Sequence, residues 1–126
     1  MLNREVMTPD STPTLRLRAQ QRVIMVHDDL NACTRLIDRL REAFIVRVTT
    51  SVAEMEEQLT PIERVTAIVC VSGKSVRAYQ VHHAFTRAGG KPERIVYVAK
   101  DAIADSSRAI DDAIGVVRRV AAHVRS

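Results

Sequence analysis

The chain has 126 residues, of which 46% are hydrophobic, 27% are charged and only 3% are aromatic. This length suits one domain that buries roughly two-thirds of its unfolded surface, and no apolar run approaches the roughly 18 residues of a membrane span. The formal net charge of +4 favours acidic partners, but so few aromatic side chains argue against modules that stack nucleic-acid bases. We expect a cytoplasmic protein that does not enter a membrane.

Residues 1–20 differ in composition from the rest of the chain. They contain Pro9 and Pro13 among polar and charged residues, where a signal peptide would need an unbroken apolar core. We expect a flexible N-terminal arm at 1–20 and one folded domain at 21–126. Within the arm, "TLRLR" at 14–18 alternates well enough to pair as an edge strand with a suitable partner.

The first strand and helix of the domain follow the arm. "RVIMV" at 22–26 is an apolar, β-branched run without polar alternation, which is typical of a strand buried on both faces. Asp29 or Asn31 can cap the helix after it. That helix has apolar side chains at helical spacing: Leu30, Cys33, Leu36, Ile37 and Leu40.

A second strand is predicted at 44–50, "FIVRVTT". Ser51 then caps a helix, and Glu54 three residues later completes a capping-box pattern. Pro61 ends this helix, whose apolar positions are Val52, Met55 and Leu59.

The third strand is predicted at 65–71, "VTAIVCV", and a helix closed by Gly89 and Gly90 follows it. "RIVYVA" at 94–99 is the fourth strand. A long last helix begins near Ala102 or Asp105 and ends near Val124. Its apolar stripe comprises Ile110, Ile114, Val117, Val120, Ala121 and Val124.

Alternating strands and helices predict an α/β fold, in which a parallel sheet has helices on both faces. Ligands of such sheets bind at the carboxyl ends of the strands. The places to search for a site are therefore "HDD", "TTS", "SGKS" and "AKD", each of which follows one predicted strand.

Residues 21–100 resemble the receiver domain of bacterial two-component response regulators. The resemblance lies in "RVIMVHDD" before an amphipathic helix, in "FIVRVTTSVAEMEEQL", and in two further apolar strands. It implies a flavodoxin-like three-layer sandwich with sheet order 2-1-3-4-5. No fifth strand with the family's lysine is evident, so we expect a truncated sheet of four strands followed by the long C-terminal helix.

The resemblance also places the receiver pocket. The acidic pair of the family falls on His27 and Asp28, with Asp29 beside them. Asp28 is similar to the metal-binding aspartate and is a weak metal candidate. Because Mg²⁺ usually needs more than one protein carboxylate, we expect no bound metal and no cofactor.

The phosphoacceptor position falls on Ser72, or on Val71 if the strand shifts by one residue, and neither side chain can form an acyl phosphate. The hydroxyl position of the fourth strand falls on Ala99. We therefore interpret residues 27–29, 72 and 99 as a degenerate phosphorylation pocket with no catalytic residue.

"CVSGKSVR" at 70–77 raises catalytic alternatives. A Walker A loop would need glycine where Ile68 stands, and a tyrosine-phosphatase loop would need arginine at Val76, whereas Arg77 comes one position late. We favour a core role for Cys70 and a helix cap at Ser75. A phosphocarrier or phosphatase-like enzyme that depends on Cys70 is the alternative.

Both cysteines, Cys33 and Cys70, lie in apolar surroundings without zinc-type spacing, which indicates buried thiols in a reducing compartment. His82 and His83 are adjacent on a helix and point in different directions, so they cannot share a metal. The basic end of the last helix suits the helix dipole, and it leaves a nucleic-acid-binding regulator as a further alternative.

The fourth strand has no fifth strand to cover it and would be a sheet edge, and such edges pair with other chains. We predict a protein interface on this strand and the last helix, at Ile95, Val96, Tyr97, Ile110, Ile114 and Val117. The expected protein is a non-enzymatic, receiver-like signalling protein that forms a homodimer or binds another signalling protein, without aspartyl phosphorylation.

Overall fold

The computed structural model describes residues 22–100 and 107–124. The predicted arm at 1–20 and the predicted start of the last helix at Ala102 or Asp105 lie outside these residues.

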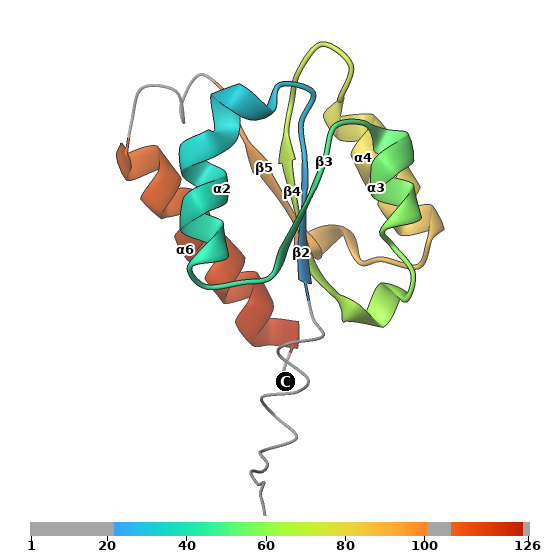
Figure 1. Cartoon of the computed structure of the whole chain (residues 1–126). Coiled ribbons are helices and arrows are strands. Elements are labelled where there is room, and N and C mark those ends of the chain that lie inside the picture. The colour runs from blue at the N-terminus through green and yellow to red at the C-terminus, as the bar shows by residue number, and fades with distance from the viewer. Residues whose placement is uncertain (1–21, 101–106, 125–126) are drawn as a thin grey trace, which may run out of the picture.

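Four parallel strands form one sheet (Figure 1). They are β2 (Arg22–Val26), β3 (Val46–Thr49), β4 (Val65–Val71) and β5 (Ile95–Val98), and their order is β3-β2-β4-β5. The predicted α/β fold with a four-stranded parallel sheet and a long C-terminal helix is therefore confirmed.

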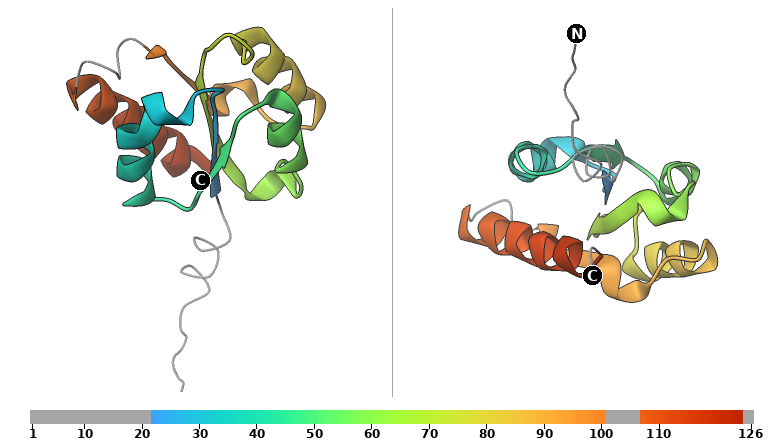
Figure 2. Two further views of the ribbon diagram at one scale, coloured as in Figure 1. Left: turned by 45° about the horizontal axis from the view of Figure 1, so that its top comes forward. Right: turned by 90° about the horizontal axis from the view of Figure 1, so that it is seen from below.

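Helices cover both faces of the sheet (Figures 1 and 2). On one face lie α2 (Thr34–Arg41) and α6 (Ser107–Val124), and on the other lie α3 (Val52–Glu57) and α4 (Ala78–Arg87). Short 3-10 turns precede α2, β4 and β5: η2 (Leu30–Cys33), η3 (Ile62–Arg64) and η4 (Pro92–Arg94).

The two central strands have the predicted bounds, whereas the two edge strands are shorter than the predicted 44–50 and 94–99. β3 pairs with β2 alone and β5 pairs with β4 alone, so each edge strand extends only as far as its single partner supports it. Phe44 lies outside β3 because its N–H donates to the Leu40 carbonyl at the end of α2, at 2.9 Å.

Hydrophobic side chains fill the space between the sheet and each pair of helices. Every residue of β4 is buried, as its unbroken apolar sequence predicts. Three residues of the predicted stripe of α6, Ile110, Ile114 and Val117, are buried in the core with α2, and Ala113 is buried beside them. Val120 and Ala121 are only partly buried, and the side chain of Val124 lies outside the described ones.

The helix starts differ from the predicted caps in three places. Ser51 caps α3 as expected, because its Oγ accepts from the N–H of Glu54 at 3.1 Å. Glu54, however, accepts from the N–H of Thr50 at 2.6 Å, one residue earlier than a capping box requires. Asp29 makes no side-chain cap, since η2 intervenes before α2, and Arg77 replaces Ser75 as the N-cap residue of α4.

Candidate functional site at the strand ends

The ends of β2 and β4 lie side by side, because these strands are neighbours in a parallel sheet. This places Asp28, just after β2, against the loop that follows β4. Asp28 Oδ2 accepts a hydrogen bond from the backbone N–H of Ser75 at 2.6 Å. The N–H of Gly73 donates to the carbonyl of Val76 at 2.9 Å and so closes the loop on itself.

Gly73 is the residue that lets the carboxylate lie so close to this loop. A Cβ at position 73 would overlap the Asp28 carboxylate and lie 2.7 Å from its Cγ. The hydrogen bond from Ser75 N–H lowers the pKa of Asp28, and its desolvation by burial opposes this effect. Asp28 is therefore a charged side chain whose hydrogen-bond partner is the backbone of the same domain.

His27 is fully buried and is held by the strands on both sides. The backbone N–H of His27 donates to the carbonyl of Thr49 at 3.1 Å. The ring Nδ1 lies 2.6 Å from the carbonyl oxygen of Val71. Because a carbonyl only accepts, we assign the proton to Nδ1. In the described part of the chain, Nε2 has no hydrogen-bond partner. His27 is thus a structural histidine at the end of β2.

The other predicted pocket residues lie farther from this contact. Asp29 is half exposed, and its Oδ2 lies 3.9 Å from Nζ of Lys100, a surface ion pair that contributes little stability. Ser72 and Ala99 are exposed. The structure therefore joins His27 to the end of β4 and Asp28 to the loop after it, and no hydrogen bond or ion pair among the described residues joins Ser72 or Ala99 to them.

Among the side chains that the structure describes, at 22–100 and 107–122, no three of His, Cys, Asp or Glu are grouped so that they could hold a metal ion. The carboxylate of Asp28 is already bound to Ser75. The donor set around Asp28 therefore fits a loop anchor better than a metal ligand.

Both cysteines are free and buried, as predicted. Cys70 lies inside β4, where it is level with Val26 of β2 and Tyr97 of β5. Burial raises the pKa of Cys70 to about 11. Burial and, to a smaller extent, the negative charge of Asp29 raise the pKa of Cys33 to about 11. Neither thiol has the exposure or the acidity of a nucleophile.

The structure places most of the predicted interface residues inside the domain. The side chains of Ile95, Val96, Ile110, Ile114 and Val117 are all buried in the core. This part of the prediction is corrected: α6 packs on β4 and β5, so its own sheet covers Ile110, Ile114 and Val117. Tyr97 is 49% exposed, and β5 is an edge of the described sheet.

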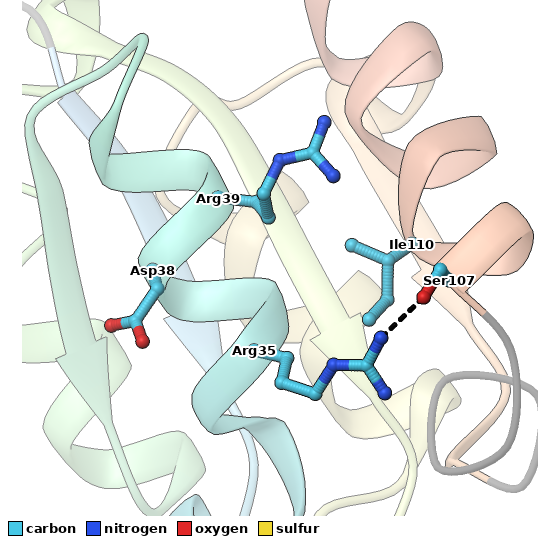
Figure 3. Close-up of a pocket in the computed structure, with 5 residues that line it drawn as sticks. All are labelled: Arg35, Asp38, Arg39, Ser107 and Ile110. Atoms are coloured by element: carbon cyan, nitrogen blue, oxygen red, sulfur yellow. Dashed lines mark hydrogen bonds between the residues drawn. The ribbon is translucent and has the colours of Figure 1, made fainter.

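A groove between α2 and α6 was not predicted (Figure 3). It encloses about 200 Å³ and is lined by Arg35, Asp38, Arg39, Ser107 and Ile110. Arg35 donates to the hydroxyl of Ser107, and Arg39 Nη1 lies 2.5 Å from Asp111 Oδ1. The spacing of residues 35, 38 and 39 shows that α2 has a polar side. The residues that contact this side, Ser107 and Asp111, lie on α6, far along the chain, so the sequence did not indicate the groove.

The groove residues connect the two helices through polar contacts. Arg39 also lies 3.8 Å from Glu42 on its own helix. Both guanidinium groups therefore have protein partners, and these contacts link α2 to α6.

No helix of the described residues has both the length and the apolar character needed to cross a membrane. A comparison with protein-family models, with curated proteins and with solved structures finds no match to this chain.

Proposed function

We propose that this chain is a receiver-like signalling protein of the cytoplasm that works without aspartyl phosphorylation and acts by binding other proteins. The sheet order β3-β2-β4-β5 supports this proposal. Counted along the described chain, these are the second, first, third and fourth strands, which is the order of the first four strands in the receiver sheet 2-1-3-4-5. Two helices on each face also agree with a three-layer sandwich.

The observation that carries the proposal is the hydrogen bond between Asp28 and Ser75. In a working receiver, the equivalent acidic residues would be available to a metal ion and a phosphoryl group. Here the carboxylate binds the loop after β4, and the neighbouring acidic position is the buried His27.

The remaining pocket positions offer no replacement chemistry. Ser72 has a hydroxyl in place of a phosphoaccepting carboxylate, and Ala99 has no hydroxyl to contact a phosphoryl oxygen. We therefore assign the regulatory role of this domain to the surfaces it presents to partners.

The test is incubation of the full chain with acetyl phosphate and Mg²⁺, followed by intact-mass measurement. We expect an unchanged mass for the wild-type chain and for Asp28→Asn, beside a working receiver that gains a phosphoryl group under the same conditions. A phosphoryl adduct on the wild-type chain that Asp28→Asn abolishes would overturn the proposal. Thermal melts with and without Mg²⁺ should give the same melting temperature, because we expect no Mg²⁺ to bind. A metal ion that bound the folded state would raise its stability.

A further inference from the structure

The two flanks of α6 have different surroundings. One flank faces α2, where Ser107 and Asp111 contact Arg35 and Arg39. In the right view of Figure 2, α2 lies along this flank of α6, and no other described helix or strand lies along the opposite flank. That opposite flank faces the same side of the molecule as the outer edge of β5, since α6 packs on β4 and β5.

The opposite flank of α6 is apolar. Val116 and Val120 follow Ser107 and Asp111 by nine residues, which is two and a half helical turns and therefore half a turn around the axis. Both valines are only partly buried, although they touch the core. Val98, the last residue of β5, is also partly buried on this face of the sheet.

Two opposite charges border the apolar flank. Asp112 lies four residues before Val116 and Arg119 lies three residues after it, so both are neighbours of Val116 on the helix surface. Both side chains are exposed, and neither forms an ion pair with any residue that the structure describes. The acidic residue lies toward the start of the helix and the basic one toward its end.

We propose that the outer flank of α6 and the outer edge of β5 bind a second copy of this chain across a two-fold axis. Antiparallel pairing of β5 with its copy continues the sheet and sets the two α6 helices antiparallel. With the axis near Val116, Asp112 of each copy faces the partner's Arg119, so the charges complement each other twice. This inference rests on the proposed function and names its partner.

The proposed interface uses both elements. β5 has only four residues, which is a short edge for a stable interface, and the flank of α6 adds apolar area beside it. Tyr97, 49% exposed on the opposite face of β5, adds an aromatic side chain at the same edge.

The test is sedimentation velocity of the full chain over the micromolar range, with charge-reversal variants. We expect a concentration-dependent dimer for the wild type. Asp112→Arg and Arg119→Asp should each weaken it roughly tenfold, because each variant creates two like-charge contacts. The double variant Asp112→Arg/Arg119→Asp should return to within about threefold of the wild type, since the charges complement again.

Glu57→Arg is the matched control, because it changes the net charge by the same amount on α3, on the other face of the sheet. It should leave the dimer unchanged. Tyr97→Lys should weaken the dimer by placing a charge on the β5 edge, and its exposed position lets the lysine side chain reach solvent. Circular dichroism melts show whether each variant is folded.

Two outcomes overturn the inference: a wild-type chain that stays monomeric throughout this range, or a dimer that neither single charge reversal weakens. A dimer that the double variant fails to restore also contradicts the assigned pairing. A monomer with an unchanged mass after acetyl phosphate treatment rejects self-association and leaves the proposed function intact. A phosphoryl adduct that Asp28→Asn abolishes rejects the proposed function whatever the oligomeric state.

Discussion

The carboxylate of Asp28 accepts a hydrogen bond from the backbone N–H of Ser75 at 2.6 Å, across a separation of 47 residues. The two residues belong to the ends of neighbouring parallel strands, where α/β proteins place their ligand sites. Gly73 gives the carboxylate its space. A side chain at the usual ligand position therefore anchors a loop of the same chain.

Gly73→Ala should destabilise the fold by about 1–3 kcal/mol, because the new methyl group displaces the Asp28 carboxylate from its N–H partner. In an Asp28→Ala background the same substitution should cost less than about 0.5 kcal/mol, since no carboxylate remains to be displaced. Urea unfolding of the four proteins measures this coupling. Additive effects of the two substitutions would show that the contact carries no energy.

Asp28→Asn should lower the free energy of unfolding at neutral pH by about 1 kcal/mol, because a charged acceptor binds the Ser75 N–H more strongly than an amide does. The folded-state pKa of Asp28 is lowered, so its stabilisation is complete above the unfolded pKa of about 3.9 and is lost as the pH falls through the folded value. The difference between the two proteins should thus be constant above about pH 5 and shrink in more acidic buffer. Urea melts over this pH range provide the measurement, and a difference that grows toward acid would contradict the assignment.

His27→Ala should cost about 2–4 kcal/mol of stability, because it leaves a cavity in the core and removes the partner of the Val71 carbonyl. His83→Ala is the matched control on the exposed side of α4 and should stay within about 0.5 kcal/mol of the wild type. Chemical denaturation compares the two. Equal effects would mean that the buried contact of His27 has no structural role.

The thiols of Cys33 and Cys70 should react with iodoacetamide at least about 100-fold more slowly in the native protein than in denaturant, because both are buried and keep their protons at neutral pH. Mass spectrometry of timed samples follows the modification. Phosphatase assays of the wild type and Cys70→Ser should give equal, background values. Rapid native modification of Cys70, or turnover that Cys70→Ser abolishes, would support the enzymatic alternative.

Gly115→Ala should stabilise the protein by up to about 1 kcal/mol, because glycine is a poor helix former and a Cβ at this position in α6 meets, among the described residues, only the Arg119 guanidinium, at 3.9 Å. The melting temperature of the variant should rise. A lower value would reveal a contact over Gly115 that the described residues do not explain.

The α/β class and the bounds of the central strands could be predicted from the sequence alone. β2 and β4 are covered on both faces, so their sequences are unbroken apolar runs with sharp ends. The cap at Ser51 was also predictable, because an N-cap bond joins residues three positions apart. Such signals are local, and each is complete within a few residues of the chain.

The tertiary structure alone decided the roles of Asp28 and of the last helix. The partner of Asp28 is a backbone N–H far along the chain, and any residue except proline could provide that group. Periodicity showed that α6 has an apolar stripe, but only packing showed that its own sheet buries Ile110, Ile114 and Val117. Hydrophobic burial has no direction, so a sequence predicts which side chains avoid water without naming the surface that covers them.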